Sequence, residues 1–221
     1  MADLKDFMPY TLYIRPNSGS FAIQVLLEEI GLPYQKLWIG TDSAAMDRLR
    51  HETAIGKIPV LMLPDGTYMF ETAAVLIHLV LAHPEAGLFA KIGTSEFAIL
   101  LQWMEFLSAD VLEAALHVYY ADHYSTDGES DADSVCRQAR AQYVASLAMV
   151  SPSLNPYLLG RKYTVADIYL YMLAAWWPGD RAQFNASLPK IGAHSALVAS
   201  RAAILTAAAD HPLMMRESVT P

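Results

Sequence analysis

The sequence contains a single cysteine, Cys136, among its 221 residues. A disulfide within the chain is therefore impossible, and the lack of a Cys-x-x-Cys pair excludes a dithiol redox mechanism. Positive charge is also scarce, because no run of basic residues occurs and the net charge is −8. Since Lys and Arg must neutralise phosphates for tight binding of nucleic acids, we expect no nucleic-acid partner.

Long hydrophobic segments are missing as well. The first six residues, MADLKD, lack the basic and apolar regions of a signal peptide. The longest apolar run in the C-terminal half covers only residues 168–177, whereas a membrane helix needs about 20 residues. We therefore expect a cytoplasmic protein without a membrane partner. Apolar residues still make up 54% of the chain, which excludes intrinsic disorder and predicts large buried faces or a subunit interface.

The first 82 residues show a β-α-β pattern followed by β-β-α. Four apolar residues after the first strand have the spacing of one helix face; they are Ile23, Leu26, Leu27 and Ile30. Gly31 and Pro33 end this helix, and the strands on either side of it predict a parallel pair. The predicted strands are residues 10–14, 34–39, 58–63 and 68–70, with a loop and short helix in 41–56 and a helix in 72–82.

The pattern after residue 93 is helical only. Thr94 or Ser95 caps a long apolar helix that runs to about Tyr120. Residues 125–134 are polar and acidic, which predicts a solvated loop without metal-ligand spacing. Further helices are predicted at residues 134–149, 164–177 and 195–209. Because α/β and all-α patterns separate so cleanly, we predict two domains, residues 1–84 and 93–221, joined by a linker at 85–92.

Two positions in the first half carry a functional signal. Pro59 interrupts a strand-like run, which indicates either an edge strand or a special turn with a cis Ile58–Pro59 bond. Glu71 and Thr72 stand where a strand becomes a helix. Thr72 is suited to an N-cap, and a helix start also favours an anion. These two interpretations of Thr72 are compatible.

Several motifs together resemble the glutathione S-transferase family, in particular its bacterial members. In the first half they are GKIPVL at residues 56–61, the Asp65-Gly66 turn and FET at residues 70–72. In the second half YTVADI at residues 163–168 resembles the buried capping box of the family, in which Thr164 caps a helix and Asp167 reaches back. The resemblance implies a thioredoxin-like α/β domain followed by a helical bundle, and it assigns the capping box to folding.

The resemblance also implies a binding site for glutathione. In the family the proline is cis, and the residue before it, here Ile58, exchanges main-chain hydrogen bonds with the cysteinyl part of glutathione. The acidic and hydroxyl pair that holds the γ-glutamyl end maps to Glu71 and Thr72. Lys57 matches a position that often contacts the tripeptide. Together with Pro59, these residues form the predicted site for glutathione as a co-substrate, without a metal.

The family places a residue that hydrogen-bonds the glutathione sulfur at the start of the first helix, where it favours the thiolate. The sequence offers three candidates there, Ser18, Asn17 and Ser20. Gly19 stands where many bacterial members keep a cysteine, and Cys136 lies in the helical half. The segment is also ordinary loop and N-cap material, with Ser20 as the natural cap, so a site without a catalytic group stays open.

A second substrate is expected between the two halves, with a wall taken from the helical half. Its candidates are aromatic or adaptable side chains; they are Trp103, Met104, Tyr119, Tyr120, His123 and Trp176. Core packing is the alternative role for each of them. His117 and His123 are suited to be general bases in an isomerase or lyase, or simply to satisfy a hydrogen bond.

These observations predict a glutathione transferase whose substrate thiolate attacks a hydrophobic electrophilic small molecule. Glutathione-dependent peroxide reduction is a variant of the same chemistry. One alternative is a non-catalytic relative that binds a ligand or a protein, because a fold does not imply an activity. Another is a dedicated glutathione-dependent isomerase or ether-cleaving enzyme. The resemblance implies a homodimer, and the charged fraction of only 17% is consistent with an interface core.

Overall fold

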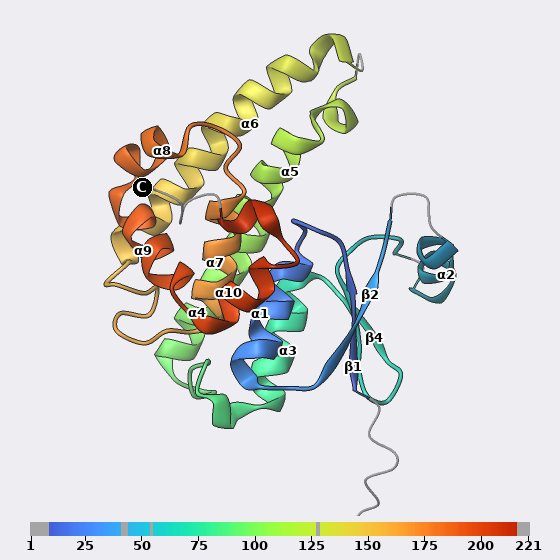
Figure 1. Cartoon of the computed structure of the whole chain (residues 1–221). Helices are drawn as coiled ribbons and strands as arrows, with labels where there is room; N and C mark the ends of the chain where they lie inside the picture. Colours follow the sequence, from blue (N-terminus) through green and yellow to red (C-terminus); the bar gives the residue numbers. More distant parts are fainter. Residues whose placement is uncertain (1–8, 41–43, 54, 127–128, 216–221) are drawn as a thin grey trace, which may run out of the picture. The chain divides into compact units, whose positions relative to one another are not determined.

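The computed structural model describes residues 9–40, 44–53, 55–126 and 129–215 of the chain. Contacts divide the chain into two compact units (Figure 1). The first, which we call the α/β unit, contains the residues up to Ala86 together with Ala202–Met214. The second, the helical unit, contains Gly87–Arg201. The C-terminal segment 202–214, which the sequence analysis assigned with the helical half, therefore makes its contacts within the α/β unit.

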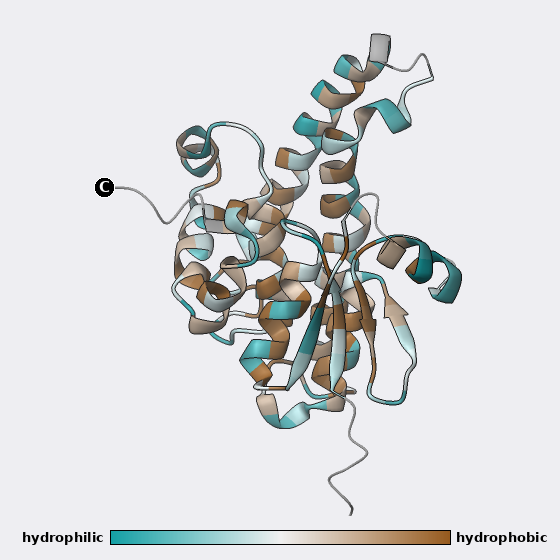
Figure 2. Cartoon of the chain, turned by 45° about the vertical axis from the view of Figure 1, so that its right-hand side comes forward, coloured by the Kyte–Doolittle hydropathy of each residue, from teal (hydrophilic) through white to brown (hydrophobic). Residues whose placement is uncertain are grey.

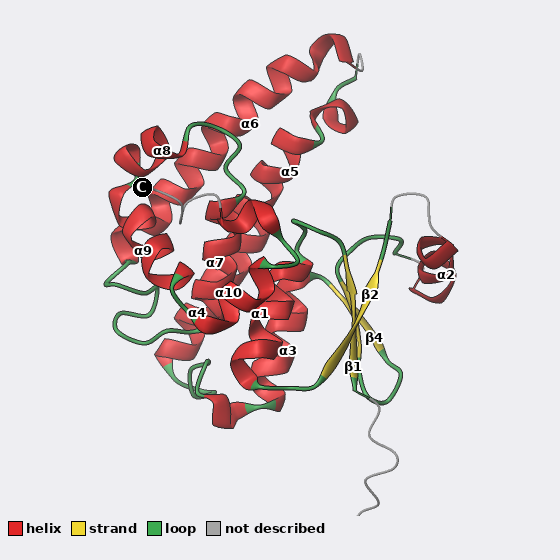
Figure 3. Ribbon diagram, viewed as in Figure 1, coloured by secondary structure: helices red, strands yellow, loops and turns green. Residues whose placement is uncertain are grey.

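The α/β unit is built on a sheet, which is drawn yellow in Figure 3. Its four strands have the order β2-β1-β3-β4. β1 pairs in parallel with β2 and antiparallel with β3, which pairs antiparallel with β4. The predicted thioredoxin-like order of elements is confirmed. Its elements are β1 (Tyr10–Ile14), α1 (Ser20–Ile30), β2 (Tyr34–Trp38), α2 (Ala44–Thr53), β3 (Val60–Met62), β4 (Tyr68–Phe70), α3 (Thr72–Ala82) and α10 (Ala202–Ala208).

The core of this unit lies around β1 and α1. Every residue of β1 is buried, and α1 is buried from Ser20 to Leu27. α1 packs against α3 and also against α10, although α10 is far along the chain. α2 contributes little to the core, because only Met46 and Leu49 are buried in a helix that is otherwise largely hydrophilic (Figure 2).

The helical unit contains no strand among its described residues, apart from isolated bridges near residues 157–162. Thr94 caps its first helix by accepting a hydrogen bond from the Phe97 N–H, at 3.2 Å, which selects Thr94 over Ser95. The elements are α4 (Ser95–Phe106), the π-helical segment η2 (Leu107–Leu112), α5 (Glu113–Tyr119), α6 (Glu129–Val150), α7 (Val165–Ala175), α8 (Arg181–Ser187) and α9 (Pro189–Ala199).

Two sequence predictions for the later helices are wrong in detail, and one helix was not predicted. α6 begins at Glu129, inside the predicted loop 125–134, which fits the preference of acidic residues for a helix N-terminus. The predicted helix 195–209 is two helices, because the Arg201 N–H bonds to the Val198 carbonyl in a tight turn. α8 was not predicted, although Asp180 caps it through the Gln183 N–H at 2.9 Å.

α7 is buried along its length from Val165 to Ala174, as predicted. The Asp167 carboxylate lies at its start and is fully buried. It accepts hydrogen bonds from the main-chain N–H groups of Thr164 at 2.8 Å and Leu158 at 2.9 Å. His194 Nε2 lies 3.1 Å from the same carboxylate. The predicted capping box is therefore confirmed, and its carboxylate joins three segments of the helical unit.

Within the described part of the chain, no single helix is long and apolar enough to cross a membrane. Only α9 and α10 taken together reach the required length and composition, and they are separated by a bend.

Candidate functional site

Three segments of the α/β unit meet where α1 begins. A β-carbon built on Gly19 would lie 2.6 Å from Thr72 Oγ1 and 3.0 Å from Pro59 Cδ. The start of α1, the loop before β3 and the start of α3 are therefore in close contact at one point. Only a glycine permits this approach, because real β-carbons do not come within 3.0 Å of such atoms.

The loop before β3 contains the Ile58–Pro59 bond, which is cis, as the resemblance implies. β3 begins only after Pro59 and lies between β1 and β4, so the edge-strand interpretation of Pro59 is wrong. Among the hydrogen bonds between described residues, none uses the main chain of Ile58. This main chain is therefore available to pair with an extended peptide. Lys57, next to it, is exposed.

The start of α3 is shaped by an unusual backbone conformation at Glu71. This residue precedes the helix with φ 65° and ψ 110°, a conformation that a residue with a β-carbon adopts at a cost of about 1–3 kcal/mol. Glu71 is exposed, whereas Thr72 is buried. The sequence suggested that Thr72 is the N-cap of α3. In the structure Thr72 is instead the first residue of the helix, and Glu71 holds the N-cap position. The Thr72 hydroxyl therefore does not cap the helix, and it faces Gly19.

Asn17 has the second unusual conformation, with φ 56°. Its N–H donates to His211 Nδ1 at 2.8 Å, and its side-chain Oδ1 accepts from the Leu213 N–H at 2.9 Å. The amide is thereby oriented, because its oxygen must face Leu213. The Nδ2 donors have no partner among the described residues. In the part of the chain that the structure describes, Asn17 and Glu71 are the only residues other than glycine with positive φ.

Ser18 and Ser20 form a hydrogen-bonded group with the carbonyl of Arg15. The Ser18 hydroxyl lies 2.8 Å from the Arg15 carbonyl and 2.8 Å from Ser20 Oγ. The Ser20 hydroxyl lies 3.2 Å from the same carbonyl and is fully buried. Both hydroxyl protons therefore have acceptors within the loop. Gly19 and not Ser20 is the N-cap residue of α1, so that sequence prediction is wrong.

His211 was not predicted as part of this region. It is fully buried, and its ring packs edge-on against Phe21, with 5.3 Å between ring centroids. Burial lowers the pKa of His211 to about 4, and the Asp210 carboxylate offsets this only in part. The imidazole is therefore neutral at physiological pH and keeps Nδ1 free to accept from Asn17. No local signal could reveal this contact, because the two residues are 194 positions apart.

The six residues predicted to form the wall of a second-substrate site all lie in the helical unit, but they differ in burial. Met104 is buried, whereas the other five are at least partly exposed. The Tyr119 hydroxyl donates to the Trp176 carbonyl, and the rings of Tyr120 and His123 stack. Trp103 packs edge-on against Phe106. The structure thus brings together Tyr119 with Trp176 and Tyr120 with His123.

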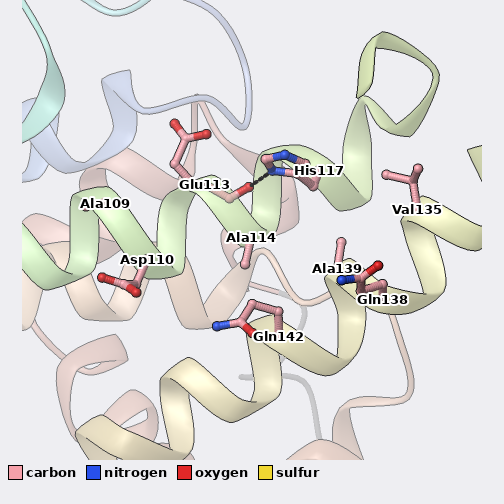
Figure 4. Close-up of a pocket in the computed structure, with 9 residues that line it drawn as sticks. All are labelled: Ala109, Asp110, Glu113, Ala114, His117, Val135, Gln138, Ala139 and Gln142. Atoms are coloured by element: carbon pink, nitrogen blue, oxygen red, sulfur yellow. Dashed lines mark hydrogen bonds between the residues drawn. The ribbon is translucent and has the colours of Figure 1, made fainter. Parts of the chain in front are cut away.

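A separate pocket of about 340 Å³ lies in the helical unit, between the η2–α5 stretch and α6 (Figure 4). None of the six candidate residues lines it. His117 Nδ1 lies 2.7 Å from the Glu113 carbonyl, and its ring stacks on Tyr124. The pocket combines apolar walls with the polar side chains of Asp110, Glu113, His117, Gln138 and Gln142. The lining residues are Ala109, Asp110, Glu113, Ala114, His117, Val135, Gln138, Ala139 and Gln142.

The described residues contain no group of three or more His, Cys, Asp or Glu side chains that could hold a metal ion.

Comparison with known proteins gives a consistent picture, although no family model matches the chain. It is 22% identical over 170 residues to glutathione S-transferase GstA of Escherichia coli O157:H7, covering 75% of this chain and 81% of that protein. It is 23% identical over 172 residues to the uncharacterised GST-like protein YncG of Escherichia coli K12, covering 76% and 82%.

In structure, the chain is similar to a glutathione transferase homologue from Sulfitobacter that was crystallised with glutathione. The TM-score is 0.78 at 26% sequence identity, over 90% of this chain and 96% of that one. Sequence and fold together confirm the resemblance to the glutathione S-transferase family.

Proposed function

We propose that this chain, which resembles the glutathione S-transferase family in sequence and fold, binds glutathione on the α/β unit and stabilises the thiolate for attack on an electrophilic small molecule. The observation that carries this proposal is the meeting of Gly19, Pro59 and Thr72 at one point. It places the starts of two helices beside a free stretch of main chain. Such a site suits a peptide that carries a carboxylate and a thiol.

Each part of glutathione has a candidate partner in this arrangement. The main chain of Ile58 is free among the described residues and would pair with the cysteinyl part. The first turn of α3, with the Thr72 hydroxyl, would bind the γ-glutamyl carboxylate, since the first N–H groups of a helix lack partners within it. Glu71 is exposed beside it and would bind the γ-glutamyl ammonium group. Lys57 is exposed and offers a charge for the remaining carboxylate.

Asn17 is the candidate that we favour for activation of the sulfur. Its Nδ2 donors are free within the described residues, whereas the hydroxyl protons of Ser18 and Ser20 already have acceptors in the loop. A donor beside the sulfur stabilises the thiolate more than the thiol and so lowers the pKa of the thiol. Ser18 is the second candidate, because it is partly exposed while Ser20 is buried.

The reaction would join the glutathione sulfur to an electrophilic carbon, and the leaving group would depart with the electron pair of its bond. The aromatic side chains of the helical unit are our candidates for the hydrophobic partner's wall, with Tyr119 and Trp176 foremost. In the peroxidase variant the same thiolate would attack a peroxide oxygen, and the O–O bond would break to release an alkoxide or hydroxide that takes up a proton. A second glutathione would then attack the sulfur of the resulting sulfenic acid, which gives oxidised glutathione and water. We also propose a homodimer, by analogy with the family.

A non-catalytic relative is the second candidate function. It is favoured by Gly19, where a side chain is sterically excluded and where many members of the family carry a cysteine. Such a protein would bind glutathione and leave the thiol protonated. A dedicated isomerase or ether-cleaving enzyme would share the activated thiolate and would differ in its substrate and in the reaction that follows the attack.

Calorimetric titration with glutathione tests the proposal. We expect binding that weakens about tenfold in Thr72→Val, because a hydrogen bond to a charged group is lost while the shape is kept. Thr67→Val, the same change in an exposed hairpin turn, is the matched control and should bind normally. Absence of binding to the unaltered chain would refute the proposal, and binding without a thiolate signal would select the non-catalytic relative.

A further inference from the structure

The loop that carries Asn17 is held by a segment from the other end of the chain. The Asn17 N–H and side-chain oxygen are bound by His211 Nδ1 at 2.8 Å and the Leu213 N–H at 2.9 Å. A non-glycine residue with positive φ persists only when its surroundings fix it. Two contacts on one residue, both from residues 211–213, provide that fixation.

The C-terminal segment is itself anchored to the α/β unit beside this loop. Asp210 Oδ2 accepts from Gln24 Nε2 on α1 at 2.7 Å and from Lys36 Nζ on β2 at 2.6 Å. α10 packs against α1, and the His211 ring lies against Phe21. The position of His211 is thus set by α1 and β2, and His211 in turn sets the position of Asn17.

A gain in stability does not explain why the imidazole of His211 is buried. With Nδ1 as acceptor, the proton lies on Nε2, which is buried and has no acceptor among the described residues. An unpaired buried N–H costs free energy. What the imidazole gains is the hydrogen bond that its Nδ1 accepts from the Asn17 N–H.

We propose that the segment 209–214 is part of the glutathione site, with His211 and Leu213 as positioning residues that aim the Asn17 amide at the sulfur. This inference rests on the proposed function, in which Asn17 donates to the thiolate. Leu213 takes up the amide oxygen and so leaves the Nδ2 donors for the ligand. His211 accepts from the Asn17 N–H and so holds the main chain of Asn17 in its positive-φ conformation.

Two variants of His211 separate positioning from packing. His211→Phe keeps an aromatic ring against Phe21 and removes the acceptor. His211→Asn keeps an acceptor close to the place of Nδ1. The reference is Asn17→Gly, which removes the amide and tolerates positive φ. Folding of each variant is checked by circular dichroism, so that only folded proteins enter the comparison.

The measurement is the pKa of the thiol of bound glutathione, from the ultraviolet absorbance of the thiolate across pH. We expect His211→Phe to raise this pKa by about one unit relative to the unaltered chain, as one hydrogen bond to a charged group would. The Kd for glutathione should stay within about threefold. His211→Asn should restore most of the shift, and adding His211→Phe to Asn17→Gly should raise the pKa no further.

The outcomes distinguish the two proposals. If the unaltered chain binds glutathione with an unshifted thiol pKa, thiolate activation is refuted and the positioning role falls with it. If the pKa is lowered and Asn17→Gly raises it while His211→Phe does not, activation stands and the positioning role is refuted. If His211→Phe and Asn17→Gly raise the pKa by independent amounts, His211 acts by another route and the positioning role is again refuted.

Discussion

The hydroxyl of Thr72 occupies the space into which a side chain at Gly19 would project, since a β-carbon on Gly19 would lie only 2.6 Å from Thr72 Oγ1. This contact joins the starts of α1 and α3 directly. It also explains why the cysteine that many members of the family keep at this position has no room here. Under the proposed function, activation of a bound thiol would therefore come from a residue other than Gly19.

Gly19→Ala tests this contact. We expect it to destabilise the fold by about 1–3 kcal/mol, because the methyl group overlaps Thr72 Oγ1 and approaches Pro59. Urea unfolding measures the change. The matched experiment introduces the same alanine into Thr72→Ala, where the nearest atom is absent. The cost of Gly19→Ala should be smaller there; an equal cost in both backgrounds would show that the contact is not as described.

Ser18→Ala distinguishes the two partly exposed candidates for sulfur activation, Asn17 and Ser18. The Ser18 hydroxyl already donates within the loop, to Arg15 or Ser20. We therefore expect its removal to leave the thiol pKa of bound glutathione unchanged, while Asn17→Gly raises it by about one unit. The reverse result, with a shift in Ser18→Ala alone, would transfer the role to Ser18.

The stability of the fold should fall in acid because of His211. Its pKa is lowered from its ordinary 6.5 to about 4 by burial. Between these values the unfolded chain binds a proton at His211 and the folded chain does not, so stability rises with pH. The contribution is present above about pH 6.5 and is lost as the pH falls toward 4, by at most about 3 kcal/mol.

Urea unfolding at about pH 7.5 and about pH 5 measures this dependence, with His211→Phe as the comparison because it cannot titrate. Other groups titrate in both proteins. The contribution of His211 is therefore the difference in pH dependence of stability between the unaltered chain and His211→Phe. The unaltered chain should lose more stability than the variant. Equal losses would show that His211 is not kept neutral by the fold.

Asp167→Asn should be one of the more damaging conservative changes in the helical unit. The buried carboxylate accepts from Thr164 and Leu158, and an amide would turn a donor toward one of these donors. We expect a loss of about 3 kcal/mol in urea unfolding. Asp180→Asn, at the exposed cap of α8, is the control and should cost under about 0.5 kcal/mol, since Asn caps a helix as well as Asp. Similar costs at both positions would contradict the structural role of Asp167.

Local patterns in the sequence predicted most of the fold. β1, β4 and α3 begin and end where alternation, turn residues and helical spacing placed them. The capping box at Asp167 was also predictable, because its two partners are three residues apart. These features depend on neighbours along the chain, which a single sequence displays.

The parts that could not be predicted depend on distant contacts. His211 holds Asn17 across 194 positions, and nothing near either residue indicates the other. The π-helical segment η2 interrupts an apolar pattern that reads as one continuous helix. Gly19 could be read as a missing cysteine from the sequence, and only its distance to Thr72 shows that no side chain fits there.

Under the proposed function this chain binds glutathione and stabilises its thiolate, and the most direct test is the pKa of the thiol in the complex with the unaltered protein. Titration of the thiolate absorbance across pH gives this value, with free glutathione as the reference. We predict a pKa at least about one unit below that of the free tripeptide. Glutathione that binds with the pKa of the free tripeptide would contradict the account and indicate a binding protein without thiol activation.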